Sequence, residues 1–145
     1  MDMSFQEKSA WGSLIILALV SYWFFPTALD IAGKTTNPAE LYVLMIGCVV
    51  TLIIFEVIYH TIIAATGHTD KDERDRLFGM QAERNAAFAL WTGLFWIVGH
   101  ILISAATEEV APVSKLEIAV WILFALSASE FVKLASQIWY YRANI

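Results

Sequence analysis

The sequence predicts an all-α membrane protein built as an antiparallel bundle of four transmembrane helices. Four apolar stretches occupy most of the 145-residue chain. Each is long enough to cross a hydrocarbon layer about 30 Å thick at a rise of about 1.5 Å per residue. The composition agrees, because 59% hydrophobic residues and six tryptophans are more than a soluble domain of this size can hide in its core.

The four predicted spans are joined by short connections, so we expect one domain over residues 1–145. In order, the spans cover approximately residues 11–33, 41–66, 86–106 and 116–140. The first span is too long for the apolar core of a signal peptide, and we expect it to remain as a helix. Asn37-Pro38 and Ala111-Pro112 stop helices in two connections, and short connections make successive spans antiparallel.

Basic residues orient the predicted bundle. Seven of the nine lysines and arginines lie at or near one side, and only Lys34 and Lys115 lie at the other. Because lysine and arginine are retained in cytoplasmic connections, we expect both termini to face the cytoplasm in the inner (plasma) membrane. The net charge of -5 without a basic patch gives no reason to expect a nucleic-acid partner. The single cysteine, Cys48, lies in the second span and is interpreted as a small buried hydrophobe.

The connection between the second and third spans is dense in charge. We expect a cytoplasmic helix over about residues 69–85, with Thr69 or Asp70 as its N-cap. Opposite charges four residues apart would support this helix. Since it leads directly into the third span, it must either project into the cytoplasm or bend near Gly79.

This charged helix has two interpretations. The simpler one is the interfacial start of the third span. The other is a docking surface for a protein partner, because charges of both signs surround the helix, whereas a helix lying on lipid needs a clear apolar face. The candidate partner-binding residues are Asp72, Glu73, Arg74, Asp75, Arg76 and Arg84.

The same segment carries a resemblance. The run Asp72-Glu73-Arg74-Asp75-Arg76-Leu77 continues through Ala82-Glu83-Arg84-Asn85-Ala86 directly into an apolar span. This pattern resembles the hallmark of an uncharacterised family of small four-helix membrane proteins of bacteria and archaea. The resemblance covers roughly 20 residues and the four-span layout. It implies a prokaryotic inner-membrane location and supplies no catalytic residue.

A few ionisable residues fall within the predicted spans: Glu56, His60, His100, Glu130 and Lys133. Charges at that depth are costly unless they are paired or face a wet cavity. Glu56 shares a helix face with His60, and Glu130 shares one with Lys133. The two pairs lie at similar depths, so we expect them to face one another across the bundle. They would either fasten the helices together or provide a carboxylate that exchanges a proton or binds a cation.

Metal and catalytic chemistry have little support in the sequence. His100 lies about 10 Å from His60 along the membrane normal, so one ion is not expected to touch both. No Ser/His/Asp or Cys/His arrangement, P-loop or dinucleotide motif is present. We therefore expect no cofactor, no metal and no enzymatic activity.

The sequence thus favours a noncatalytic integral membrane protein with an accessory, scaffold or regulatory role. The chain would lie in the lipid bilayer. Its charged helix would contact another membrane protein or a cytoplasmic protein. The alternative is a small proton- or cation-coupled transport or sensing protein that uses Glu56, His60, Glu130 and Lys133. Assembly into a homo-oligomer stays open.

Overall fold

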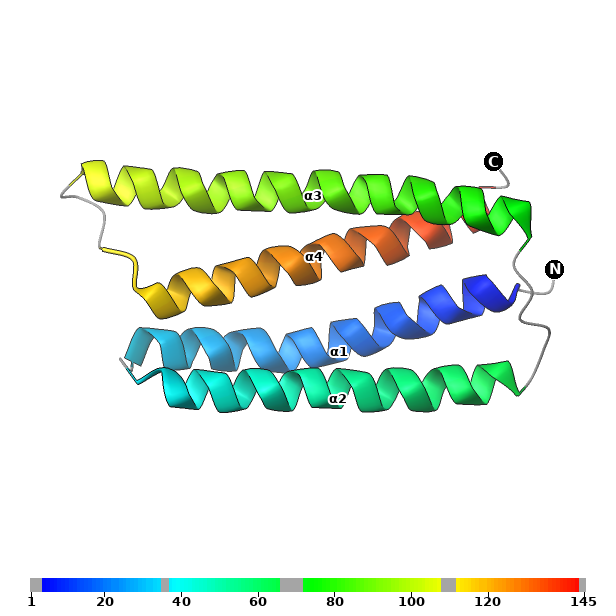
Figure 1. The fold of residues 1–145 in the computed structure, drawn as a ribbon, viewed down its shortest axis with the longest axis horizontal. Coiled ribbons are helices and arrows are strands. Elements are labelled where there is room, and N and C mark those ends of the chain that lie inside the picture. Colours follow the sequence, from blue (N-terminus) through cyan, green and yellow to red (C-terminus); the bar gives the residue numbers. More distant parts are fainter. Residues whose placement is uncertain (1–3, 35–36, 66–71, 108–111, 144–145) are drawn as a thin grey trace.

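The computed structural model contains four long α-helices that run antiparallel to one another (Figure 1). It describes residues 4–34, 37–65, 72–107 and 112–143. The helices are α1 (Phe5–Lys34), α2 (Pro38–Ala64), α3 (Glu73–Ala106) and α4 (Lys115–Arg142). All four are long and apolar enough to cross a membrane. The predicted all-α fold with four membrane-spanning helices is confirmed.

Side-chain oxygens that accept hydrogen bonds from free backbone N–H groups cap the starts of all four helices. Asn37 Oδ1 accepts a hydrogen bond from Ala39 N at 3.1 Å, and Pro38 occupies the first turn of α2, where its missing N–H costs nothing. At α4, Ser114 Oγ accepts from Glu117 N at 3.0 Å. Glu117 Oε2 in return accepts from Ser114 N at 2.8 Å, which completes a capping box.

The N-cap of α3 is Asp72, so the prediction of Thr69 or Asp70 was wrong. Asp72 Oδ1 accepts a hydrogen bond from Glu73 N at 2.7 Å, and Asp75 Oδ2 accepts from Asp72 N at 3.2 Å. The carboxylate of Asp75 stands at the third helical position, from which it reaches the N-cap backbone. Thr69 and Asp70 themselves lie outside the described residues.

From this cap, α3 is one continuous helix of 34 residues that passes through Gly79. At about 1.5 Å per residue it is about 51 Å long, well beyond a hydrocarbon layer of about 30 Å. Of the two sequence-based alternatives, the helix therefore projects beyond the apolar layer instead of breaking at Gly79.

The helices lie in the spatial order α3, α4, α1, α2 (Figure 1). α1 and α4 occupy the middle, while α2 packs mainly on α1 and α3 mainly on α4. The edge helices expose large apolar side chains such as Ile54, Phe55 and Phe95, as expected of faces that meet lipid. The starts of α1 and α3 and the ends of α2 and α4 share one end of the bundle, which we call the charged end (Figure 1).

The core lies where α1, α2 and α4 meet. Phe24 and Ala28 of α1 pack with Val120 of α4 and with Cys48 of α2, all of which are buried. This confirms the interpretation of Cys48 as a buried hydrophobe. Close helix approach in this region depends on small side chains such as Ala28, which has no exposed surface.

Candidate functional site

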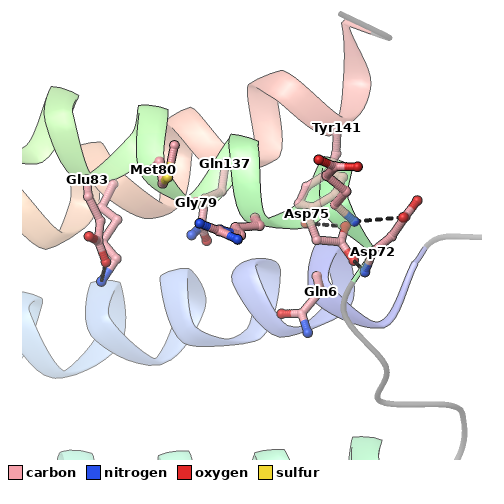
Figure 2. Close-up of a pocket in the computed structure, with 11 residues that line it drawn as sticks. Gln6, Asp72, Asp75, Gly79, Met80, Glu83, Gln137 and Tyr141 are labelled. Carbon is pink, nitrogen blue, oxygen red and sulfur yellow. Dashed lines mark hydrogen bonds and ion pairs between the residues drawn. The ribbon is translucent and has the colours of Figure 1, made fainter.

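A cavity of about 690 Å³ opens at the charged end between α1, α3 and α4 (Figure 2). We call it the polar groove, because most of its lining side chains are charged or form hydrogen bonds. It is lined by Gln6, Asp72, Glu73, Asp75, Arg76, Gly79, Met80, Glu83, Lys133, Gln137 and Tyr141.

One wall of the polar groove is fixed by Tyr141 of α4. Its hydroxyl donates a hydrogen bond to Asp75 Oδ1 at 2.8 Å, while the other oxygen of Asp75 caps α3. The buried Phe78 packs beside this bond, edge-on to Tyr141 with 5.1 Å between ring centroids and stacked on Tyr140 at 5.8 Å. The first turns of α3 are therefore held firmly against the last turns of α4.

An ion pair joins the two chain ends next to the groove. Arg142 Nε donates to Glu7 Oε1 at 2.6 Å, and Glu7 is only 8% exposed. The backbone N–H of Glu7 donates to Ser4 Oγ at 3.1 Å, which caps the start of α1. The sequence did not reveal this pair, since nothing in the spacing of residues so far apart along the chain indicates contact.

Asn85 forms a second connection that the sequence did not reveal. Its Nδ2 donates to Ser136 Oγ at 3.1 Å and to the Tyr140 hydroxyl at 2.9 Å. These bonds join α3 to α4 next to the polar groove. An amide that satisfies two partners within apolar surroundings fixes the rotation of both helices.

The predicted intramembrane pairs belong to two separate clusters. Lys133 Nζ lies 3.3 Å from Glu130 Oε1 and 3.9 Å from Glu83 Oε1, so its partner across the helices is α3. No hydrogen bond or ion pair among the described residues joins this cluster to Glu56 or His60. The expected contact between the two pairs is therefore not formed, because α2 packs mainly on α1 while Lys133 turns toward α3.

Glu56 and His60 bind serines of α1 instead. Glu56 Oε2 lies 3.0 Å from His60 Nε2 and accepts a hydrogen bond from Ser13 Oγ at 2.8 Å. Ser9 Oγ lies 3.5 Å from His60 Nδ1. The four side chains form a small polar cluster at the α1–α2 contact, with His60 and Glu56 side chains 43% and 31% exposed. This arrangement gives both ionisable groups partners without any residue of α4.

His100 lies apart from both clusters. Its ring stacks on Trp96 with 5.5 Å between centroids and meets the edge of Trp121 at 5.0 Å. Within the described ranges, no group of three or more His, Cys, Asp and Glu side chains is placed to hold a metal ion.

The structure brings together four of the six candidate partner-binding residues: Asp72, Glu73, Asp75 and Arg76 all line the polar groove. Arg74 instead lies over the Phe78 ring, with its guanidinium carbon 5.0 Å from the ring centroid. Arg84 is not among the lining residues. From α1 and α4 the groove gains Gln6, Gln137 and Tyr141, which only tertiary packing could reveal.

No known family, curated protein or solved structure matches this chain. Its function must therefore be inferred from the polar groove and the other residues already described.

Proposed function

We propose that this chain is a noncatalytic membrane protein that binds a basic segment of a partner protein in the polar groove. The observation that supports this most is the charge of the lining, which carries four carboxylates against two cations. One of those cations, Lys133, already lies beside Glu130 and Glu83. The remaining excess of negative charge favours lysine and arginine side chains, because complementary charge steers association and selects the partner.

Two carboxylates are available to a bound lysine or arginine. Asp72 and Asp75 are engaged in the cap of α3, and Asp75 also accepts from Tyr141. Glu73 is exposed. The Glu83 side chain is 70% exposed, and Lys133 Nζ lies 3.9 Å from its carboxylate. Gly79 lies between them along the helix and leaves open space in the lining. The volume of about 690 Å³ lies within the range of about 300–1,000 Å³ typical of ligand sites.

The proposal is tested with purified protein in lipid nanodiscs and a fluorescent lysine-rich peptide. The Glu73→Gln/Glu83→Gln variant should bind this peptide about tenfold more weakly, because two partly exposed ion pairs together contribute about 1.4 kcal/mol. The matched control is Asp30→Asn/Glu40→Gln, which removes the same charge at the opposite end of the helices and should bind like the wild type.

Two results would contradict groove binding: equal losses in both double variants, or equal affinity for a glutamate-rich peptide of the same length. Affinity should also fall as salt rises, because exposed charges are screened. In native membranes, a photo-crosslinker at Met80 identifies the partner, and the crosslinked residues should lie in a lysine- or arginine-rich segment.

We further propose that the chain lies in a bacterial inner membrane with its charged end in the cytoplasm. The support is the placement of seven of the nine lysines and arginines at or near that end. In a Cys48→Ala background, Glu73→Cys should be labelled by an impermeant thiol reagent only after the membrane is opened. Glu40→Cys, which also replaces an exposed glutamate but at the opposite end, should be labelled in intact cells. The reverse pattern would invert the orientation.

Proton- or cation-coupled transport or sensing is the second candidate function. It would depend on Glu56 and His60 with Ser9 and Ser13, since Glu130 and Lys133 belong to the other cluster. Partner binding is preferred because the hydrogen bonds of Ser13 and the contact with His60 already satisfy Glu56. Glu56→Gln should leave peptide binding unchanged, whereas a coupled transport activity would be lost in the same variant.

A further inference from the structure

A second cavity, of about 520 Å³, lies mainly between α3 and α4 away from the charged end, and Leu29 of α1 also lines it. We call it the apolar groove. Small residues leave the space open, namely Ala89 and Gly93 of α3 and Ala128 of α4, while Trp96 and Trp121 form walls. A Cβ added to Gly93 would lie 3.0 Å from the Cβ of Ala125, so the two helices approach closely beside the groove.

The lining of this groove is almost entirely hydrocarbon and aromatic ring. No charged residue contributes to it, and the hydroxyl of Thr92 donates to Phe88 O within its own helix at 2.9 Å. Because the groove lies within the apolar part of α3 and α4, it is placed to meet the hydrocarbon of lipids. Its volume is in the range of sites that enclose a small ligand, about 300–1,000 Å³.

A histidine with free hydrogen-bonding capacity stands at one edge of the groove. His100 stacks on Trp96 with the rings within 1° of parallel, and it meets the edge of Trp121 at 5.0 Å. Both tryptophans also line the groove. Among the residues that the structure describes, none forms a hydrogen bond with the His100 ring. A neutral imidazole offers one donor and one acceptor, and leaving them unused within a membrane is costly.

The order of these features along α3 matches the layout of a membrane lipid. His100 stands six residues before the helix end at Ala106, about 9 Å from that end. The apolar lining on α3 begins at Ile97 and ends at Ala89, which lies about 12 Å from Ile97 toward the middle of the helix. A polar headgroup beside His100 would therefore lie nearer the membrane surface than its chain.

We propose that the apolar groove and His100 form a binding site for a neutral amphiphilic lipid. Its hydrocarbon chain would fill the groove between α3 and α4, and a hydroxyl or carbonyl oxygen of its headgroup would hydrogen-bond to His100. The headgroup is neutral because the ring contacts of His100 are two tryptophans and the groove lining carries no charge, so nothing there pairs with a charged headgroup. This site is independent of the polar groove and of the partner proposed for it.

The test uses a photoactivatable diacylglycerol in nanodiscs, with a phosphatidylglycerol that carries the same photoactivatable chain as the comparison. Diacylglycerol should label peptides of α3 and α4 that line the groove, and phosphatidylglycerol should label them much less. His100→Phe keeps a ring between the tryptophans but removes both hydrogen-bonding nitrogens. It should reduce diacylglycerol labelling about fivefold, the effect of one neutral hydrogen bond.

Ala128→Leu fills the groove and should reduce diacylglycerol labelling to the phosphatidylglycerol level. Its matched control is Gly47→Leu, which adds the larger side chain where nothing lies within 4 Å on α2, and it should label like the wild type. Equal labelling by the two lipids, or His100→Phe without effect, would overturn the site. Crosslinks between two copies of the chain at Ala128, instead of to lipid, would assign the groove to a helix of a second copy and overturn it as well.

Discussion

Replacing Gly12 by alanine should lower the free energy of unfolding by about 2 kcal/mol. The Tyr59 ring of α2 lies directly against Gly12 of α1, so that any Cβ at Gly12 would overlap the ring atoms. The Tyr59 hydroxyl also donates to Lys8 O at 2.6 Å, and that bond is lost if the ring moves. Overpacking costs about 1–3 kcal/mol, and the part-buried Tyr59 ring can shift, so we take the lower end of this range; the lost hydrogen bond adds about 1 kcal/mol. Reversible unfolding in mixed detergent and dodecyl sulfate micelles measures the change.

The sign of this effect should depend on Tyr59. In a Tyr59→Ala background, Gly12→Ala should be neutral or stabilising, because alanine favours a helix by about 1 kcal/mol relative to glycine. Gly47→Ala is the matched control, since nothing lies within 4 Å of a Cβ at that position, and it should be neutral or stabilising in the wild type. A large loss from Gly12→Ala that persists without the Tyr59 ring would contradict the packing described here.

Arg142→Ala should cost about 2 kcal/mol of stability. The guanidinium is the partner of Glu7, whose side chain is only 10% exposed, and the bond is short at 2.6 Å. Removing the arginine leaves a carboxylate that is shielded from water and lacks its cation. Hydrogen bonds to charged groups contribute about 1.5–3 kcal/mol, and the 60% exposure of Arg142 places the expected loss toward the lower part of that range.

A second substitution distinguishes the lost ion pair from lost packing. Glu7→Gln/Arg142→Ala should be more stable than Arg142→Ala alone, because a neutral amide tolerates the site without a cation. Lys34→Ala provides the matched control: its pair with Asp30 is also 2.6 Å long, but the two side chains are 74% and 58% exposed. We expect a loss of about 0.5 kcal/mol or less there. Equal losses in the Lys34 and Arg142 variants would show that burial of Glu7 contributes nothing.

The N-cap of α3 shows how precisely the local sequence predicts where a helix begins. A start of α3 within the charged connection was predicted, because acidic residues crowd the first turn of a helix. The N-cap itself was predicted at Thr69 or Asp70, and this prediction was wrong, since several side chains of the run have capping-box spacing. The structure selects Asp72, whose partner Asp75 is also held by Tyr141 from the far end of the chain.

Similar depth in the membrane did not predict which of the intramembrane pairs are in contact. Glu56 with His60 and Glu130 with Lys133 were correctly placed on shared helix faces, because spacing along a helix fixes which side chains are neighbours. Which helix each face meets depends on the order of helices around the bundle. The short connections between the helices are compatible with α2 packing beside α4. In the structure, however, α2 packs mainly on α1.

The sequence by itself determined that four apolar helices cross the membrane, that they alternate in direction, and where charge gathers along the chain. These properties follow from hydropathy, length and spacing, which are local and therefore readable in one dimension. Tertiary structure alone decided the order α3, α4, α1, α2, and with it the Glu7–Arg142 pair, the Tyr59 contact with Gly12 and both grooves. Each of these joins residues far apart in the chain. Helix association in lipid is selected by packing and hydrogen bonds between whole surfaces, and no single segment encodes it.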